Sequence, residues 1–580
     1  MQGILSTLAI VWRIASPYFR SEDRWPGRIL LAAVIAIELS IVGITVLINE
    51  WNNRFYNALQ NRDWHAFVYQ LGYFCVLAAI FIVLAVYQLY LNQWLQIRWR
   101  RWLTATYLDH WLAGANHYRM QLLGDAADNP DQRISEDINQ FIQLTLSIGL
   151  QLLNSAVTLG SFMIILWALS AEAPLHLFGA SFSIPGYLLW AALIYAVIGT
   201  AFTHLIGRAL IALNFQQQRY EADFRFNLVR VRENSEQIAL LTGEPAERER
   251  LLGRFGNVVA NWYAIMTRQK KLTFFTAGYA QASVVFPFVM ASPAYFSGII
   301  QLGGLMQTAN AFGQVQGALS VFVTIYRSLA EWRAVIERLA GFDQSVAAAR
   351  AVATATPSIA LTGGVNPAID FRQLAVRLPN GAPLVNVRDI SIKLGEHVLV
   401  TGPSGAGKST LFRALAGVWP FGSGTISVPQ GARVMILPQR PYFPIAPLAA
   451  AVAYPAAPGS YDAAQVAELV AAVGLPDLAA RIEEEAHWNR MLSLGEQQRL
   501  GLARAILHAP DYLFLDEATA SLDEPAEAAL YALLERRLAD ATIVSIGHRS
   551  TLAAFHRRRL ALAREGDHYA LGEEKLAPVA

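Results

Sequence analysis

Apolar residues are concentrated in six long stretches of the first part of the chain. Each stretch is close to the roughly 20 residues that a helix needs to cross the hydrocarbon core of a bilayer. The stretches are residues 27–48, 67–91, 144–169, 185–206, 272–290 and 303–326. Helices so long and so poor in charge are rare in soluble cores, so we expect six membrane-spanning helices. Residues 4–19, which precede them, have the pattern of an amphipathic helix lying on the membrane surface.

The arginines beside these stretches predict the orientation of the helices, because positive charge favours the cytosolic side. Arginines precede the first stretch and follow the second, fourth and sixth. They include Arg24, Arg28, Arg98, Arg100, Arg101, Arg208, Arg327 and Arg333. The connections 171–184 and 291–302 contain no Lys or Arg, which suits the outer side. Both chain termini are therefore predicted to be cytosolic.

Two connections on the predicted cytosolic side, residues 98–143 and 207–271, are long and largely helical in pattern. We expect the spanning helices to continue into the cytosol, turn and return. One such turn is marked by Asn129, Pro130, Asp131, Gln132 and Arg133. The asparagine can cap a helix, and the proline suits its first position. On local sequence alone, this turn fits a docking element for another domain or an ordinary helix start equally well.

Few polar residues interrupt the apolar stretches. Glu38 lies near the middle of the first, where an ionisable group is costly unless it faces a partner or water. The last stretch carries four amides: Gln307, Asn310, Gln314 and Gln316. We favour the interpretation that these amides line a polar, water-accessible cavity; the alternative is hydrogen bonding between helices without a role towards a solute. For Glu38 the sequence favours neither a role in a cavity nor hydrogen bonding between helices over the other.

The pattern changes twice beyond the last stretch. Residues 343–367 are rich in Ala, Thr and Gly and lack apolar periodicity, which indicates a linker. From Ala368 onward, strand and helix patterns alternate as in an α/β domain. The sequence therefore predicts a membrane domain at 1–342, a linker at 343–367 and a soluble domain at 368–580.

Composition agrees with this division. Of the 580 residues, 54% are hydrophobic and only 16% charged, against about 25% charged in a typical soluble domain. The formal net charge of +2 predicts no large basic surface for nucleic acid. The single cysteine, Cys75, excludes an intramolecular disulfide framework and a cysteine-based zinc cluster.

The pattern G-x-x-x-x-G-K-S in the soluble half predicts a phosphate-binding loop. In such a loop, small residues let successive backbone N–H groups surround phosphate oxygens at a helix N-terminus. A strand pattern at 397–401 precedes the loop and a helical pattern follows it. The predicted nucleotide-binding residues are Gly402, Pro403, Ser404, Gly405, Ala406, Gly407, Lys408, Ser409 and Thr410.

Two carboxylates, Asp516 and Glu517, follow the apolar run 512–515. This pair fits the chemistry of a bound nucleotide with magnesium. We expect Asp516 to hold Mg²⁺ through water and Ser409 to bind it directly, while Glu517 polarises the attacking water. The sequence therefore predicts an ATPase that uses ATP and Mg²⁺.

Residues 492–499, Leu-Ser-Leu-Gly-Glu-Gln-Gln-Arg, resemble the signature of ATP-binding cassette (ABC) proteins. Further cassette motifs occur in the family's order. Gln439 matches the glutamine loop that senses magnesium and contacts the membrane domain, and is assigned to both the ATP and the Mg²⁺ site. Asp523 matches the loop after the second acid, and His548 matches the switch histidine that contacts the γ-phosphate.

The same resemblance implies a homodimer, in which two cassettes enclose two ATP molecules. Ser493 and Gly495 of one chain would then close over the nucleotide held by the other. Two residues depart from the common Leu-Ser-Gly-Gly-Gln signature: Leu494 replaces the first glycine and Glu496 the glutamine. Leu378 also stands where the family usually has an aromatic platform for adenine. None of these changes removes a catalytic group.

The membrane half resembles the SbmA/BacA group and its cassette-bearing, YddA-like bacterial relatives, and also the peroxisomal acyl-CoA transporters of the ABCD subfamily. The resemblance is carried by residues 49–60, 97–104, 128–134 and 221–226. It implies an exporter-type fold of six transmembrane helices followed by an α/β P-loop cassette, located in a bacterial inner membrane with the cassette cytosolic. It favours a coupling role for 129–133 and marks Glu236 as part of a second coupling segment.

The resemblance favours uptake of a bulky hydrophilic solute, such as a peptide or cobalamin. The main alternative is acyl-CoA, a fatty acid or another lipid-like substrate. A cassette ATPase acting on ribosomes or DNA is disfavoured by the six stretches and the near-neutral charge. A regulatory membrane ATPase that moves nothing is a further alternative.

Overall fold

The computed structural model describes residues 2–124, 129–172, 175–177, 180–182 and 184–574. The chain divides into two compact units. The first comprises Met1–Tyr107 and Pro130–Gly341, and the second comprises Leu108–Asn129 and Phe342–Ala580.

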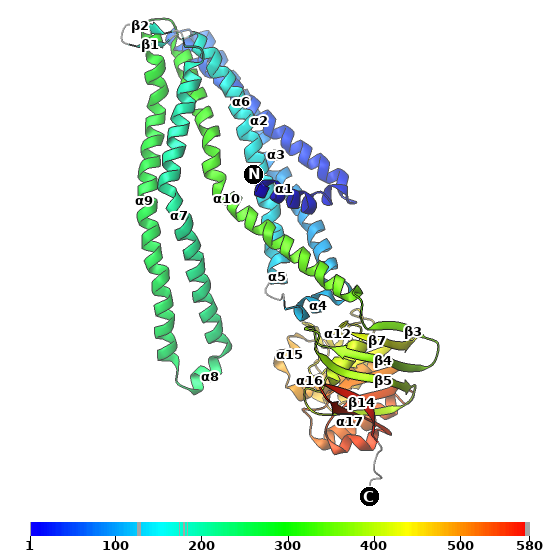
Figure 1. The fold of residues 1–580 in the computed structure, drawn as a ribbon. Helices are drawn as coiled ribbons and strands as arrows, with labels where there is room; N and C mark the ends of the chain where they lie inside the picture. Colours follow the sequence, from blue (N-terminus) through cyan, green and yellow to red (C-terminus); the bar gives the residue numbers. More distant parts are fainter. Residues whose placement is uncertain (1, 125–128, 173–174, 178–179, 183, 575–580) are drawn as a thin grey trace. The chain divides into compact units, whose positions relative to one another are not determined.

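Long helices make up the first unit (Figure 1), and each predicted stretch lies within one continuous helix except 185–206, whose first two residues precede their helix. The helices are α1 (Gln2–Ala15), α2 (Arg24–Gln60), α3 (Trp64–Leu112), α6 (Ile138–Glu172), α7 (Tyr187–Glu233), α9 (Glu244–Phe296) and α10 (Leu302–Thr354). Within the described residues, five helical segments, those of α2, α3, α6, α7 and α9, are long and apolar enough to cross a membrane. The sixth predicted span, in α10, is helical but does not meet that criterion, since its four amides lower its apolar character.

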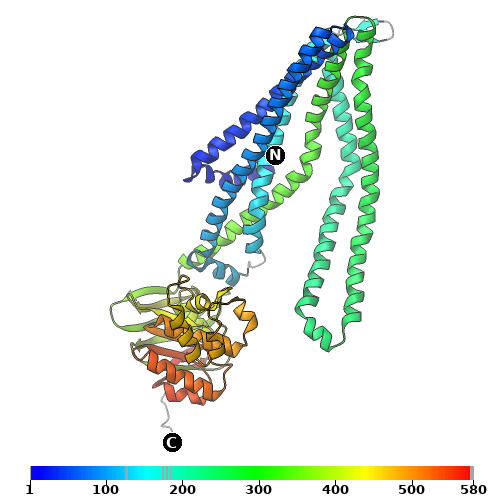
Figure 2. The same cartoon turned by 180° about the vertical axis from the view of Figure 1, so that it is seen from behind.

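Helices α7 and α9 form an antiparallel pair joined at one end by α8 (Ser235–Leu240), which Figure 2 shows from behind. The rings of Tyr195 and Tyr279 stack with centroids 4.5 Å apart. Each hydroxyl donates to the other residue's carbonyl, at 2.7 and 3.0 Å. A Cβ on Gly199 would lie 2.2 Å from the Tyr279 ring, so this close approach requires glycine.

The predicted surface helix at 4–19 corresponds to α1 and the following 3₁₀ turn Tyr18–Arg20. The Tyr18 ring is fully buried and stacks on Trp99 of α3, with centroids 5.7 Å apart. Arg98, one residue earlier on α3, pairs with Asp23 at 2.9 Å. The end of the N-terminal segment is therefore anchored on α3. In the predicted outer loop 171–184, strands β1 (Leu175–Leu177) and β2 (Ala180–Phe182) pair, whereas positions 173–174, 178–179 and 183 lie outside the described residues.

The predicted linker at 343–367 is wrong in part. Helix α10 continues to Thr354, and β3 (Ala360–Gly364) already belongs to a sheet. Alanine is the strongest helix former, and the alanine-rich sequence from 347 to 353 extends the helix although it lacks apolar periodicity.

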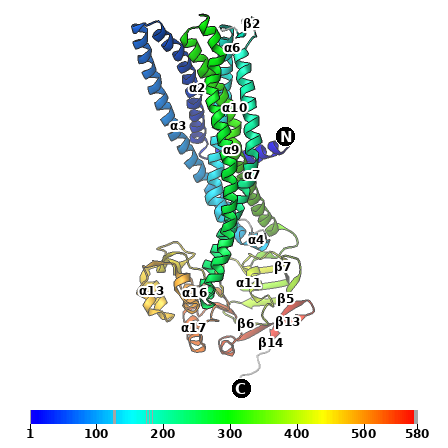
Figure 3. The ribbon, with the colours of Figure 1, turned by 90° about the vertical axis from the view of Figure 1, so that its left-hand side faces the viewer.

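The soluble half (Figure 3) contains a sheet of ten strands in the order β3-β7-β4-β5-β14-β13-β6-β12-β11-β8. Its further strands are β4 (Ala368–Arg377), β5 (Pro383–Lys393), β6 (His397–Thr401), β7 (Gly422–Pro429), β8 (Val434–Leu437), β11 (Tyr512–Asp516), β12 (Thr542–Ile546), β13 (Arg558–Glu565) and β14 (His568–Glu574). Strands β13, β6, β12, β11 and β8 are parallel to one another. Their carboxyl ends share one edge, which is where ligands bind in such sheets.

Three helices of this unit position the candidate site: α11 (Lys408–Leu415), α16 (Leu494–His508) and α17 (Glu524–Arg537). The remaining helices are α12 (Leu448–Ala453), α13 (Ala463–Ala472), α14 (Pro476–Ala479) and α15 (Trp488–Met491), and the two-residue strands β9 (Ala446–Pro447) and β10 (Glu485–Ala486) pair beside them. Apolar side chains of β6, β11 and β12 are buried on both faces of the sheet.

The second unit also contains α4 (Asn116–Leu122), far earlier in the chain than the cassette. The Arg119 guanidinium donates to the Gly417 carbonyl at 3.1 Å, at the end of α11. Leu122 packs against the apolar cluster that β4, β5 and α11 form. The cassette therefore includes a helix supplied by the connection between α3 and α6.

Candidate functional site

The phosphate loop connects β6 to α11, as the sequence predicts. All three of its glycines have positive φ: Gly402 at 147°, Gly405 at 78° and Gly407 at 90°. A Cβ on Gly407 would lie 2.6 Å from Val385, and one on Gly402 would lie 2.8 Å from Leu562. Both conformation and close packing therefore demand glycine at these positions.

Lys408, the first residue of α11, is buried and points into this loop. Its Nζ donates to the carbonyls of Gly402 and Pro403, at 2.8 and 2.9 Å. Burial lowers the pKa of Lys408, while the nearby carboxylates of Glu517 and Asp516 raise it. The ammonium group thus lies where a phosphate bound to the loop would meet it.

Ser409 and Asp516 lie together at the carboxyl end of β11. The Ser409 hydroxyl donates to Asp516 Oδ1 at 2.8 Å. Burial raises the pKa of Asp516, and the hydrogen bond from Ser409 opposes that shift. A hydroxyl and a carboxylate this close offer the hard oxygen ligands that Mg²⁺ prefers, with phosphate oxygens and water completing its shell. These residues therefore fit the predicted magnesium site.

Glu517 is where three predicted motifs meet. Gln439 Nε2 donates to Glu517 Oε2 at 3.3 Å, and His548 Nε2 lies 3.4 Å from Glu517 Oε1. The backbone of Glu517 has a φ of 50°, an unfavourable conformation for a residue with a side chain. Such strain persists only where the surroundings impose it, and it is typical of functional sites.

A groove of about 490 Å³ runs beside the phosphate loop and the predicted switch histidine. Its lining includes Gly402, Ser404 and His548, and also Arg559 of β13, which the sequence analysis did not single out. Arg559 Nε donates to Thr401 at 3.2 Å and pairs with Glu574 at 3.1 Å. Nothing in the sequence around Arg559 indicates that it lies beside the phosphate loop, because a single arginine within a strand pattern belongs to no motif.

The signature segment begins α16, and Ser493 is its N-cap. Ser493 Oγ lies 3.4 Å from the Glu496 N–H, and the Glu496 carboxylate accepts from the Ser493 N–H at 2.8 Å and from its hydroxyl at 2.7 Å. This is a capping box, in which cap and third residue satisfy one another. Glu496, which departs from the common signature, thus stabilises the start of the helix. The spacing Ser-x-x-Glu in the sequence is itself typical of a capping box.

Gln498, one turn along α16, is a connecting residue that sequence reasoning missed. It is 1% exposed. Its Nε2 donates to the Gln439 carbonyl at 3.0 Å, and its Oε1 accepts from the Ser521 N–H at 3.0 Å. Within the same chain, Gly495 packs against Leu522, and Asp523 caps α17 by accepting from the Ala526 N–H at 3.2 Å. The signature helix, the glutamine loop and the loop after Glu517 are therefore linked.

In the membrane unit, the amides of α10 contact α2. Asn49 Nδ2 donates to the Gln307 carbonyl at 3.1 Å and to Asn310 Oδ1 at 3.3 Å. Asn53 Nδ2 donates to Gln307 Oε1 at 2.6 Å. Gln314 and Gln316 are half-buried. The contacts of Gln307 and Asn310 correspond to the alternative of hydrogen bonding between helices, and the cavity role of the four amides stays a prediction.

Glu38 lines a separate polar cavity of about 400 Å³ with Gln88, Asn92 and Asn154. Its carboxylate is 7% exposed and accepts from Gln88 Nε2 and, at 2.6 Å, from Asn154 Nδ2. Among the residues that the structure describes, the cavity lining contains no Lys, Arg or His, and none of the four amides of α10. Two neutral amides therefore solvate this carboxylate in the membrane unit.

The first predicted coupling segment begins where expected: Pro130 starts the short helix α5 (Pro130–Gln132). A π-helix, Arg133–Asp137, follows it. Arg133 is buried in an ion pair with Asp137, which also pairs with Arg338 of α10 at 2.6 Å. The ion pair of Arg133 with Asp137 therefore lies inside the first unit. Glu236 lies on α8. The coupling roles of both segments stay predictions. Within the connection between α3 and α6, helix α4 contacts the cassette, through Arg119 and Gly417.

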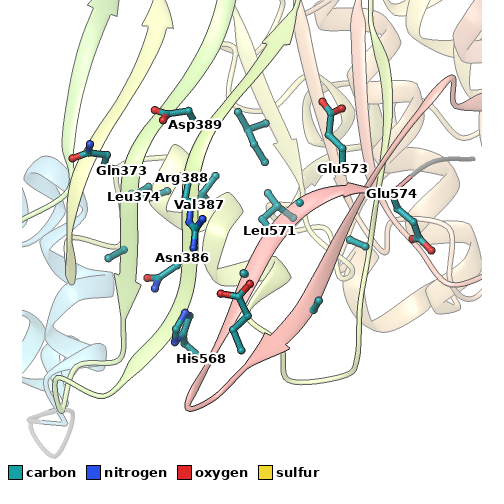
Figure 4. A pocket seen from close by; sticks show the side chains of 17 residues that line it. Gln373, Leu374, Asn386, Val387, Arg388, Asp389, His568, Leu571, Glu573 and Glu574 are labelled. Carbon is teal, nitrogen blue, oxygen red and sulfur yellow. The ribbon is translucent and has the colours of Figure 1, made fainter.

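A larger groove, of about 850 Å³, lies between β5 and β14 (Figure 4). These strands pair only at Val385–Tyr569 and Asn386–Ala570 and then diverge. Asp389 and His568 line the groove, but no residue of the phosphate loop does. Its carboxylates Glu573 and Glu574 are already paired with Arg558 and Arg559. The groove is separate from the candidate site.

Comparisons with known proteins cover both halves of the chain. Residues 14–296 match the family described as ABC transporter transmembrane region 2, and residues 385–520 match the family described as ABC transporter. The chain is 34% identical to the inner membrane ABC transporter ATP-binding protein YddA of Escherichia coli, covering 92% of this chain and 94% of that protein. It is 26% identical to the lysosomal cobalamin transporter ABCD4 of Homo sapiens, covering 89% and 88%.

A solved structure of a bacterial Atm1-family ABC exporter with ATP bound is similar over 93% of this chain and 94% of that one. The TM-score is 0.71 at 18% sequence identity, which shows the fold. The predicted fold class, a helical membrane domain followed by an α/β cassette, is confirmed.

Proposed function

Because the chain belongs to the ABC transporters, in which a membrane region and a cassette ATPase act together, we propose that it works as a homodimer that takes up a bulky hydrophilic solute across a bacterial inner membrane. Peptides and cobalamin are the proposed solute classes. The observation that carries this proposal is the meeting of Gln439, Glu517 and His548 beside the phosphate loop, in a chain with long apolar helices.

ATP hydrolysis in this proposal uses the chain's own groups as follows. The phosphate loop and Lys408 bind the polyphosphate, and Ser409 and Asp516 hold Mg²⁺, which neutralises phosphate charge when bound. Glu517 orients and polarises the attacking water. His548, 3.4 Å from Glu517, contacts the γ-phosphate, and Gln439 reports the state of the site to the membrane helices.

A second copy of the chain completes the site. The residues that would do so are Ser493 and Gly495, and Ser493 lies exposed at the N-terminus of α16. Helix N-termini attract anions, so this surface suits a phosphate held by the other chain. The residues at 129–133 and Glu236 of α8 would transmit the closure of the two cassettes, together with α4.

Three observations support a hydrophilic solute. The cavity around Glu38 is lined by amides and hydroxyls. The resemblance of the membrane half to the SbmA/BacA group points the same way. A relative covering most of the chain is described as a cobalamin transporter. Glu38 and the amides Gln307, Asn310, Gln314 and Gln316 are the proposed solute-facing residues.

A lipid-like substrate, such as acyl-CoA or a fatty acid, is the second candidate. One observation favours it: Gln307 and Asn310 are engaged with α2, which removes polar groups that a hydrophilic solute would contact.

The ATPase assignment is tested with purified protein in lipid. Glu517→Gln keeps the shape of the side chain but removes the carboxylate, so Mg²⁺-dependent ATP hydrolysis should fall at least about 100-fold while ATP binding persists. Retention of hydrolysis by this variant would contradict the role of Glu517.

The solute is tested by uptake into cells that lack their own transporters. We expect accumulation of a labelled hydrophilic peptide or of cobalamin with the wild type and none with Glu517→Gln. Glu38→Gln, which preserves the shape of the cavity lining, should change uptake while leaving basal ATPase activity near wild type. If no hydrophilic probe accumulates and acyl-CoA stimulates the ATPase, the substrate is lipid-like and the proposal of a hydrophilic solute is wrong.

A further inference from the structure

We propose that Glu527 is a positioning residue for ATP hydrolysis: its buried carboxylate holds the segment that carries His548 against the segment that follows Glu517. Glu527 does not itself contact nucleotide in this scheme. The inference rests on the proposed roles of Glu517 and His548 and extends them to the structure that sets their separation.

Glu527 lies in the first turn of α17 and is only 2% exposed. A buried carboxylate is costly unless hydrogen bonds or ion pairs compensate it. Its Oε1 accepts a hydrogen bond from the hydroxyl of Thr519 at 2.6 Å. Thr519 is itself 4% exposed and stands two residues after Glu517. One carboxylate oxygen thus fixes the chain just beyond the proposed catalytic acid.

The other oxygen faces the segment after His548. Glu527 Oε2 accepts from the hydroxyl of Thr551 at 3.1 Å and lies 3.6 Å from Arg549 Nη1. Arg549 is the residue next to His548, and Thr551 follows two residues later. A single buried group therefore bridges the two segments that carry the proposed catalytic pair.

Arg549 strengthens this bridge. Its Nη1 donates to the Leu522 carbonyl at 2.5 Å and its Nη2 donates to the Ala520 carbonyl at 3.1 Å. Both carbonyls belong to the loop after Glu517. The fork of the guanidinium thus spans the gap between the two segments, and the adjacent carboxylate of Glu527 compensates its charge.

His548 depends on this support because its own side chain is half-exposed, at 53%, and faces Glu517 across 3.4 Å. Its position relative to Glu517 is set by the backbone that Arg549 and Thr551 hold. Displacements of about 1 Å in a catalytic group can lower rates about 100-fold. Loss of the Glu527 bridge should therefore reduce turnover more than nucleotide affinity.

A purely structural role is the competing explanation, since an acid in the first turn of a helix also stabilises the helix dipole. Glu524 provides the matched control. It occupies the first turn of the same α17 but is exposed. Glu524→Gln removes the same charge from the same turn without touching the bridge.

The experiment measures kcat, the KM for ATP, the stoichiometry of ATP binding and the thermal unfolding midpoint of the full-length protein in lipid. For Glu527→Gln we expect kcat to fall about tenfold while the KM for ATP stays within about twofold. Arg549→Gln should act similarly, and the double variant should lose no more than the larger single variant, because both act through one bridge. Glu524→Gln should match the wild type.

Thr551→Val, which removes one hydroxyl at a half-buried site, keeps the proposal testable if Glu527→Gln unfolds; it should lower kcat about threefold at unchanged ATP-binding stoichiometry. The proposal is overturned if kcat stays within about twofold in these variants, if it falls only in proportion to ATP-binding stoichiometry, or if the Glu527 and Arg549 effects multiply. Persistent hydrolysis in Glu517→Gln would instead refute the proposed function beneath it.

Discussion

His556 lies just before β13 of the cassette and is buried. Its ionisation limits the pH range in which the folded protein is stable. Its ring is 4% exposed; Nδ1 lies 2.7 Å from the Leu552 carbonyl and Nε2 lies 2.9 Å from the Ser545 hydroxyl. Burial, with a smaller contribution from nearby His397, lowers the pKa of His556 to about 4, although the hydrogen bond to the Leu552 carbonyl opposes this shift. The folded protein therefore holds His556 neutral where the unfolded chain would protonate it.

The sign of the resulting pH dependence follows directly. As pH falls from about 6.5 to about 4, only the unfolded state gains the proton, so stability is lost over this window and levels off below it. The full effect corresponds to about 3 kcal/mol. Thermal unfolding of the full-length protein at a series of pH values should show this loss, and His556→Asn should show a flatter profile.

His568→Asn is the control, since His568 is partly exposed beside Asp567. Equal pH profiles for wild type and His556→Asn would show that other groups govern the acid sensitivity of the cassette.

The residues proposed to bind phosphate or magnesium could be singled out from the sequence because each belongs to a spaced motif. Lys408, Ser409 and Asp516 lie together as the sequence indicates. Gln498 and Glu527 were not predictable, because their importance arises from burial and from contacts with segments distant in sequence. A buried polar residue that contacts several distant segments belongs to no local sequence pattern.

At the scale of elements, α2 and α10 approach each other closely at Gly303. A Cβ there would lie 1.9 Å from the Asn53 carbonyl oxygen. The Gly303 N–H also donates to Asn57 Oδ1 at 2.8 Å. Asn57 of α2 thus binds the first turn of α10, where backbone N–H groups have no partner within the helix.

We predict that Gly303→Ala separates these helices and destabilises the membrane unit by about 1–3 kcal/mol. Gly304→Ala is the matched control, because its Cβ would meet only Ile300, at 3.6 Å. The temperature at which purified protein loses its monodisperse state should fall for Gly303→Ala and not for Gly304→Ala. Equal behaviour of both variants would show that the contact at Gly303 is not tight in the membrane.

The long helices were predictable as elements because apolar length is a strong signal. Two features of the connections were not. The alanine-rich end of α10 lacks apolar periodicity, a pattern that indicates a linker, but its high helix propensity continues the helix. Helix α4 is short, and its role depends on the contact of Arg119 with Gly417 rather than on any local pattern.

At the scale of the whole molecule, the proposed homodimer places Lys408 and Ser493 of one nucleotide site on different chains. Lys408→Ala and Ser493→Arg should each abolish hydrolysis in homodimers. A mixed dimer of the two variants regains one intact site, since the unmodified Lys408 of one chain faces the unmodified Ser493 of the other. Co-expression should therefore restore measurable ATPase activity, up to about a quarter of wild type if one site suffices.

Isolation of the mixed dimer with two different affinity tags provides the measurement. A double variant carrying both changes in one chain, co-expressed with wild type, is the control for subunit exchange. An inactive mixed dimer that still binds ATP would argue against a site shared between chains.

The placement of α4 in the cassette unit also bears on how the protein is made. Arg119 and Gly417 are 298 positions apart. At about 5–20 residues per second, the ribosome needs about 15–60 s to supply the partner of this helix after the helix itself has been synthesised. During that interval the ribosome synthesises α10 as well as α6, α7 and α9, which are long and apolar enough to cross a membrane, while Leu122 and Arg119 lack their final contacts. A nascent chain arrested before Gly417 should therefore be more open to protease at α4 than the completed protein, because the partners of Arg119 and Leu122 are still missing.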